Sequence, residues 1–221
     1  MDKLIQLWMA NGFIPFKESL EPHDVGIIIF NELVWRYFVQ DVVEYSPSNI
    51  SCKMHDLMHD LAQSIMRLEY VVVESNKEAK VPKMIRHLNY TQCPYWDVEV
   101  CKVRSLRSCI APPNNYGRHK SPLPVFLKQK YLRVCNSTHQ PSEKVPRLIT
   151  SLKHLEVSRH VSFRLKVLPE SITCLLNLQT LNLDSCQSLH KLPNGIRHMK
   201  NLIYLGLRYC YSITCMPEGM G

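Results

Sequence analysis

Apolar residues recur at a fixed spacing over the last part of the chain. Between positions 178 and 217 one arrangement occurs twice, each member returning 24 residues later. The two copies are Leu178, Leu181, Leu183, Cys186, Leu189, Leu192 and Pro193, then Leu202, Leu205, Leu207, Cys210, Ile213, Met216 and Pro217. The alternation around Leu181 and Leu183 predicts a short strand with both side chains directed inward. One such coil cannot bury these side chains, whereas stacked coils share a continuous core.

This spacing, L-x-x-L-x-L-x-x-C with a period in the twenties, is the signature of a leucine-rich repeat. Earlier stretches have the character of further strands, at residues 84–90, 105–109, 131–134 and 152–157. We therefore expect a leucine-rich-repeat solenoid with a parallel sheet over residues 84–221.

The earlier coils are less regular than the last two. Val145-Pro146 and Leu168-Pro169 lie 23 residues apart, and residues 152–157 are short against the later coils. We expect residues 112–124, rich in Pro and Asn, to form a surface loop. The chain stops partway through a coil with no terminal cap, so we expect a domain truncated at the C-terminus.

The N-terminal third has a different pattern. We expect helices at 2–11, ended by Gly12, at 22–36 and at 55–67, with a hairpin formed by strands 38–43 and 50–53. Helices followed by a hairpin predict a small winged-helix domain over residues 1–68. Residues 69–83 are expected to form a junction, which opens with the strand-like stretch 69–74. The predicted fold class is α+β, with two domains.

Composition limits the setting in which the protein acts. The apolar fraction is 45%, ordinary for a globular protein, and no apolar run is long enough for a membrane span. The N-terminus lacks the features of a signal peptide. The nine cysteines form neither a C-x-x-C pair nor a zinc-like quartet. We expect reduced, mostly packed thiols in a cytoplasmic protein that does not contact membranes.

The formal net charge is +8, and much of the excess lies between Cys101 and Lys166, where Glu143 and Glu156 are the only acids. Such a stripe can attract nucleic acid or acidic partners. We favour the interpretation that this basic stripe is a solvent-exposed surface of the repeats.

Three segments carry a resemblance to a known family. Residues 52–62 (CKMHDLMHDLA), 4–13 (LIQLWMANGF) and 30–36 (FNELVWR) resemble plant intracellular nucleotide-binding leucine-rich-repeat immune receptors, also called NB-ARC-LRR disease resistance proteins. The order is also similar to that of the family: a winged helix, an M-H-D segment, and then repeats with the L-P-x-x-I pattern at 168–172 and 192–196.

The resemblance implies a role for the M-H-D histidine, which is His55 in this chain. In the family this residue faces the phosphates of ADP bound in a preceding nucleotide-binding domain, and an imidazole can donate a hydrogen bond to a phosphate oxygen. Asp56 is expected to support His55 and the start of the helix. Release of this latch by ATP, or by a pull from the repeats, would switch the receptor. Met58-His59-Asp60 repeats the letters one turn later, and we interpret it as helix surface.

The sequence contains no G-x-x-x-x-G-K-[ST] loop to cradle phosphates. We therefore expect a fragment that, alone, neither binds ADP or ATP tightly nor hydrolyses ATP. The resemblance implies a non-enzymatic regulatory and recognition module, whose partners are the nucleotide-binding domain of a complete receptor and a pathogen-derived or host protein. Strand positions expected to be exposed for that protein are Gln179, Thr180, Asn182, Asp184, Ile203, Tyr204, Gly206 and Arg208.

Two alternatives belong to other functional classes. His55 and His59 lie at i and i+4, as in helical zinc peptidases, but Asp56 stands where those enzymes have a Glu base. The second alternative, suggested by the net charge, is a DNA-binding winged-helix protein with a repeat-based protein-interaction domain. Residues 22–35 contain no Lys or Arg, so phosphate contacts would be few and nucleic acid is an unlikely partner.

Overall fold

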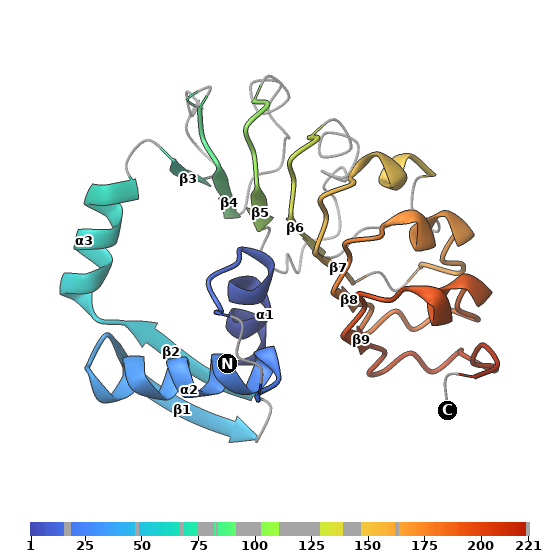
Figure 1. The fold of residues 1–221 in the computed structure, drawn as a ribbon, viewed down its shortest axis with the longest axis horizontal. Coiled ribbons are helices and arrows are strands. Elements are labelled where there is room, and N and C mark those ends of the chain that lie inside the picture. The colour runs from blue at the N-terminus through green and yellow to red at the C-terminus, as the bar shows by residue number, and fades with distance from the viewer. Residues whose placement is uncertain are drawn as a thin grey trace. The chain divides into compact units, whose positions relative to one another are not determined.

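The structure is a computed structural model. It describes residues 1–15, 19–46, 49–66, 69–74, 82, 84–91, 103–110, 129–138, 147–161 and 164–219. The chain divides into two compact units, Met1–Arg67 and Leu68–Gly221. Each is described by itself (Figure 1).

The first unit contains three helices and one hairpin. Its elements are α1 (Asp2–Ala10), α2 (Pro22–Trp35), β1 (Val39–Ser46), β2 (Asn49–Met54) and α3 (Asp56–Met66). Gly12, with φ of 72°, follows the end of α1, and Pro22 occupies the first turn of α2, where its missing N–H costs nothing. The small core pairs Ile5 and Ala10 of α1 with Val25 and Phe30 of α2. The predicted helices and hairpin are confirmed.

The second unit is a solenoid with one parallel sheet of seven strands in chain order. In Figure 1 the strands follow one another along the inner side of an arc, and 3-10 segments lie on its outer side. The strands are β3 (Tyr70–Glu74), β4 (His87–Thr91), β5 (Ser108–Ile110), β6 (Val134–Thr138), β7 (Val157–Val161), β8 (Thr180–Asn182) and β9 (Tyr204–Gly206). The 3-10 segments are η2 (Arg147–Ser151), η3 (Glu170–Cys174) and η4 (Asn194–His198). The α+β fold class, with a winged helix and a leucine-rich-repeat sheet, is confirmed.

The sheet begins within the segment that we expected to be a junction. Strand β3 pairs in parallel with β4, from Tyr70 against His87 to Glu74 against Thr91. Residues 69–74 therefore contribute a strand to the second unit, because their alternating valines extend the same core. Two further expectations, the loop at 112–124 and the Val145-Pro146 pair, lie outside the described residues.

Several strands start later in each coil than the leucine pattern indicates. Strand β7 begins at Val157, although we expected one over 152–157. The first leucine closes a turn before the strand instead: the amide of Leu155 donates to the carbonyl of Leu152 at 3.0 Å, and that of Leu178 to Leu175 at 3.1 Å. The turn therefore ends at the first leucine of L-x-x-L-x-L, and only residues after that leucine pair with the neighbouring strand.

One apolar core runs through the described coils. Leu178, Leu181, Leu183, Cys186, Leu189 and Leu192 are all buried, each Leu contributing roughly 1.5–3 kcal/mol. The positions 24 residues later are only partly buried from Leu202 to Ile213. Cys210 fits beneath the turn, its Sγ donating to the carbonyl of Leu183 in the preceding coil at 3.1 Å. This contact explains the small residue at that position.

Candidate functional site

His55 lies between the hairpin and α3 and is held from both sides. Its backbone N–H donates to the carbonyl of Phe38 at 2.9 Å, and its own carbonyl accepts from the amide of His59 at 2.9 Å. Its ring atom Nδ1 accepts a hydrogen bond from the amide of Leu57 at 3.3 Å. The side chain therefore caps the N-terminus of α3, and a ring that accepts at Nδ1 carries its proton on Nε2.

Asp56 is the first residue of α3, and its side chain is exposed. Within the described part of the chain, no hydrogen bond or ion pair joins it to His55. The ring is oriented by the Leu57 amide, whereas Asp56 adds a negative charge beside the exposed N–H groups of the first turn.

His59 lies one turn further along α3, on the helix surface. Among the described residues, its side-chain polar contacts are with its own helix: its Nε2 lies 3.3 Å from Gln63 Nε2 and its Nδ1 lies 3.6 Å from Asp60 Oδ1. No group of three or more His, Cys, Asp or Glu in the described ranges is arranged to hold a metal ion.

The apolar face of α3 is not covered by the rest of its unit. Leu57, Leu61 and Ile65 share one side of the helix, and their exposed fractions are 71%, 49% and 74%. None of the described residues of α3 is buried. An apolar stripe of this kind is ordinarily covered in a folded protein, so burial of these side chains requires something beyond the described residues of the first unit.

The eight predicted recognition positions do not share one environment. Ile203 and Arg208 are exposed, and Gln179, Asp184 and Tyr204 are partly exposed. Thr180 and Asn182 are buried, with exposed fractions of 3% and 6%, and Gly206 is buried as well. The expectation that these three are exposed is wrong, because β8 is paired with β7 on one side and β9 on the other, and Gly206 lies against Asn182 and Asp184.

Asn182 and Asp184 have structural roles between coils. The Oδ1 atom of Asn182 accepts from the backbone N–H of Asp184 at 2.9 Å. The Oδ1 atom of Asp184 in turn accepts from the backbone N–H of Arg208 in the next coil at 2.9 Å. A Cβ on Gly206 would lie 2.8 Å from that same Oδ1, so a larger residue would have to displace the Asp184 side chain from its contact with Arg208.

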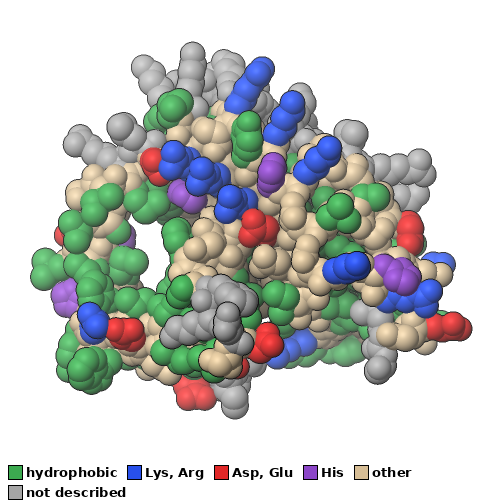
Figure 2. Space-filling model, viewed as in Figure 1, with side chains coloured by type: hydrophobic (Ala, Val, Ile, Leu, Met, Phe, Trp, Pro, Cys, Tyr) green, Lys and Arg blue, Asp and Glu red, His purple; other side chains and the backbone are tan. Residues whose placement is uncertain are grey.

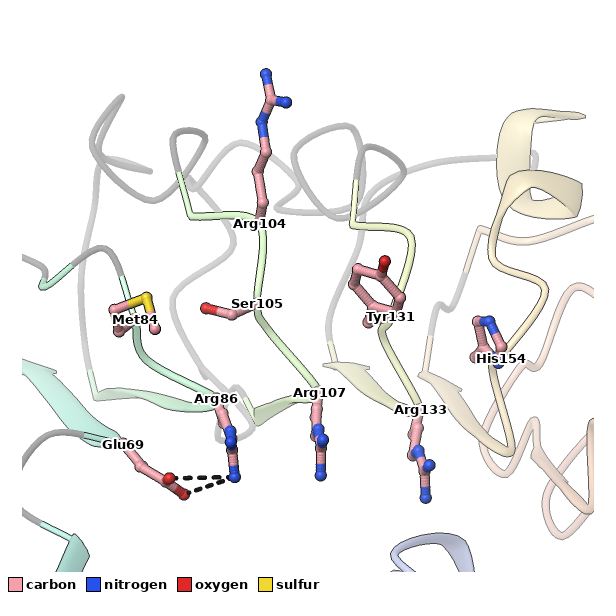
Figure 3. Close-up of a pocket in the computed structure, with 9 residues that line it drawn as sticks. All are labelled: Glu69, Met84, Arg86, Arg104, Ser105, Arg107, Tyr131, Arg133 and His154. Carbon is pink, nitrogen blue, oxygen red and sulfur yellow. Dashed lines mark hydrogen bonds and ion pairs between the residues drawn. The ribbon is translucent and has the colours of Figure 1, made fainter.

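Sequence reasoning missed a pocket in the first coils. Its volume is about 750 Å3, and it lies wholly within the second unit (Figure 3). The residue just before each strand stands in one row, because its amide donates to its counterpart one coil earlier: Arg86 to Glu69 at 2.8 Å, Arg107 to Arg86 at 2.7 Å, Arg133 to Arg107 at 2.7 Å, and Glu156 to Arg133 at 2.8 Å. The signal that could have revealed it is an Ile or Leu followed by Arg before three successive strands.

Charges in this row are unevenly paired. Arg86 forms an ion pair with Glu69 at 3.1 Å, and Arg133 Nε lies 3.9 Å from Glu156 Oε1. The Arg107 side chain makes no ion pair or hydrogen bond with any described residue. Burial raises the pKa of the Glu156 carboxyl, and Arg133 opposes that rise.

The described residues include no helix long and apolar enough to cross a membrane.

The fold defines a class of protein: a winged-helix domain followed by leucine-rich repeats. Residues 1–62 match the winged helix domain of disease resistance proteins. The chain is 31% identical to the disease resistance protein RGA2 of Solanum bulbocastanum over 188 residues, which are 85% of this chain and 17% of that protein. Over 64 residues it is 48% identical to the putative disease resistance protein RGA4 of the same species, covering 29% of this chain and 6% of that one.

A solved leucine-rich-repeat protein of Leptospira interrogans is 25% identical, with a TM-score of 0.44, covering 52% of this chain and 28% of that chain. The N-terminal part of the chain therefore carries the winged helix domain of disease resistance proteins, and most of the chain is similar to plant disease resistance proteins, although it spans only about a sixth of the length of RGA2, 17%.

Proposed function

We propose that this chain is the regulatory and recognition part of a cytoplasmic plant immune receptor. The first unit supports the ADP-bound off state of a nucleotide-binding domain through His55, and the repeats bind a pathogen-derived or host protein. The winged helix domain of disease resistance proteins at the N-terminus and the similarity to RGA2 over most of the chain support the general assignment. The finer roles rest on the arguments that follow.

The observation that carries the proposal is the position of His55. Because Nδ1 is occupied by the Leu57 amide, Nε2–H is the ring atom left to donate to a phosphate oxygen. The positive end of the α3 dipole lies at the same place and favours an anion there. A neutral imidazole fixed in this tautomer is a directional donor.

ADP fits this arrangement only in part. His55 offers one donor, and Asp56 is an exposed carboxylate that would repel a phosphate placed beside it. The nucleotide-binding domain must therefore supply the remaining phosphate contacts. His55 would favour the ADP-bound off state, because it contacts a phosphate in one arrangement of the domains and loses that contact in the other arrangement.

The uncovered face of α3 supports docking onto that domain. Leu57, Leu61 and Ile65 begin one residue after Asp56 and follow the same helix, so a domain that presents a phosphate to His55 would also cover them. Burying such side chains contributes roughly 1.5–3 kcal/mol each, which is enough to hold a closed state.

The last coil supports a recognition role for the repeats. Ile203 is 59% exposed and Arg208 is exposed, and Tyr209 and Tyr211 pack edge to face at 6.2 Å beyond β9. Exposed aromatic and Arg side chains are enriched in protein interfaces. Thr180, Asn182 and Gly206 shape this surface from below rather than contacting a partner.

The test uses a complete receptor built around this segment and expressed in leaf tissue. His55→Ala and Asp56→Val should each cause cell death without an elicitor. The first variant removes the phosphate donor, and the second removes the carboxylate that stabilises the first turn of α3 and with it the position of His55. His59→Ala is the matched control, since it removes the same side chain one turn away, and it should leave the leaf unaffected.

Unchanged leaf tissue with both His55→Ala and Asp56→Val, or equal cell death with His59→Ala, would argue against the latch. The isolated chain should not bind ADP tightly, because it lacks a phosphate-cradling loop. Micromolar ADP affinity measured by titration calorimetry on the isolated chain would contradict this part of the proposal.

A further inference from the structure

The arginine row is a built feature of the first coils. We use this name for Arg86, Arg107 and Arg133, whose side chains point to the same side in Figure 3, whereas Arg104 extends the other way. Since parallel strands lie about 4.8 Å apart, the row spans about 10 Å. Figure 2 shows Lys and Arg side chains gathered on this face of the repeats.

Acidic residues close the row at both ends. Glu69 occupies the equivalent position before β3 and Glu156 the one before β7, each in contact with its neighbouring arginine. Arg107, in the centre, has no anionic partner in the described ranges. The row is therefore a short cationic segment of fixed length rather than an open basic surface.

Polar side chains line the pocket beside the row. Ser105, Tyr131 and His154 stand two residues before Arg107, Arg133 and Glu156, and the Tyr131 and His154 rings stack with centroids 6.1 Å apart. The Ser105 hydroxyl already donates to the carbonyl of Ile85 at 2.8 Å, so it offers its oxygen as an acceptor. The Tyr131 side chain is exposed and brings a phenolic O–H to the rim.

We propose that this pocket binds a compact anion with two or more phosphate groups, held by the arginine row. This inference does not rest on the nucleotide role of His55, which lies in the other unit.

Guanidinium groups match phosphate oxygens with paired, charge-assisted hydrogen bonds, and a phosphate ester carries more charge than a carboxylate. The three arginines stand just before neighbouring strands, which lie about 4.8 Å apart. Their positive charges repel one another where Glu69 and Glu156 do not offset them, and a multiply charged anion removes that repulsion. The pocket volume, about 750 Å3, is within the range of small-molecule sites.

The acids at the two ends argue against a long polyanion. An acidic peptide or a nucleic acid strand running along the row would place negative charges against Glu69 and Glu156. A compact ligand avoids both residues. Length selectivity therefore distinguishes this proposal from general attraction to a basic protein.

The experiment titrates the full chain with inorganic tripolyphosphate by calorimetry at low ionic strength. Saturable binding of one equivalent is expected, and Arg107→Ala should weaken it about tenfold. Lys200→Gln is the matched control, because it removes one exposed positive charge in the last coil, and it should change affinity by less than about twofold. Glu156→Gln should strengthen binding a few-fold, which misfolding cannot mimic.

Absence of saturable binding, equal losses with Arg107→Ala and Lys200→Gln, or no gain with Glu156→Gln would overturn the proposal. A dodecamer of glutamate and a dodecamer of single-stranded DNA are titrated in parallel. Tighter binding of either than of tripolyphosphate would also overturn it, since it would identify a long polyanion as the preferred ligand.

Discussion

Equivalent positions in successive coils carry residues with different roles. Arg107 and Gln179 each precede a strand and make the same backbone contact with the coil before, yet one is a cation and the other is neutral. The backbone fixes where such a side chain stands, and the residue type decides what it can bind. Position matters as much as residue type: His55 and His59 lie one helical turn apart, and only His55 caps α3.

His87 gives a prediction at this scale. Burial lowers the pKa of its imidazole; Glu69 partly opposes this, and Arg107 and Arg86 add to it. Its Nδ1 lies 2.7 Å from Ser108 Oγ. Because the pKa is lower in the folded chain than the unfolded value of about 6.5, the unfolded state binds more protons below that pH, and stability falls as pH decreases.

The measurement is the thermal midpoint between about pH 7.5 and about pH 5.5. His87→Asn should show a smaller decrease over this interval than the unmodified chain. His190→Asn, at an exposed site in the same unit, should retain the full decrease. A pH dependence equal in all three proteins would mean that His87 does not contribute.

In the first unit, α1 and α2 approach each other closely, and the periodicity of the sequence did not indicate this contact. Leu4, Leu7 and Trp8 share one face of α1 at helical spacing, but the fully buried residues of this helix are Ile5 and Ala10. Ile5 packs against the backbone of α2 at Gly26, where no side chain intervenes. A glycine inside a helix thus permits the contact between α1 and α2.

Gly26→Ala should destabilise the first unit by about 1–3 kcal/mol, because its Cβ would clash with Ile5 and lie 2.9 Å from Ile14 Cδ1. The sign is informative, since glycine to alanine in an uncrowded helix is stabilising. Asn31→Ala, at an exposed site of α2, should change stability by less than about 0.5 kcal/mol. Urea unfolding followed by circular dichroism measures both, and a stabilised Gly26→Ala variant would show that the helices can separate at no cost.

At the scale of the whole molecule, the chain forms two units with separate cores. The second unit is stabilised by coils that bury one another, so the cost of a cavity depends on how many neighbours a coil has. Leu181 lies between coils on both sides and is fully buried, whereas Leu205, its partner in β9, is only partly buried.

Leu181→Ala should therefore cost about 2–5 kcal/mol of the free energy of unfolding of the repeats. Leu205→Ala removes the same atoms from the same repeat position and should cost distinctly less. Chemical denaturation of the two variants compares them directly. Equal losses would contradict a stack in which burial depends on neighbouring coils.

The sequence by itself determined what is local or periodic. A period of 24 residues fixed the inward leucines and the small Cys186, and Pro22 and Gly12 marked ends of helices. The motif around His55 likewise pointed to a residue at the start of a helix. Such features follow from chain geometry over a few residues, so a pattern is sufficient to predict them.

Only the tertiary structure decided which of these residues meet. It buried Thr180 and Asn182, added β3 to the sheet and left the apolar face of α3 uncovered. It also brought Arg86, Arg107 and Arg133 into one row. Burial and alignment in the repeats depend on neighbouring coils, whose paired residues begin 17 positions apart at Tyr70 and His87, and no local pattern records those neighbours.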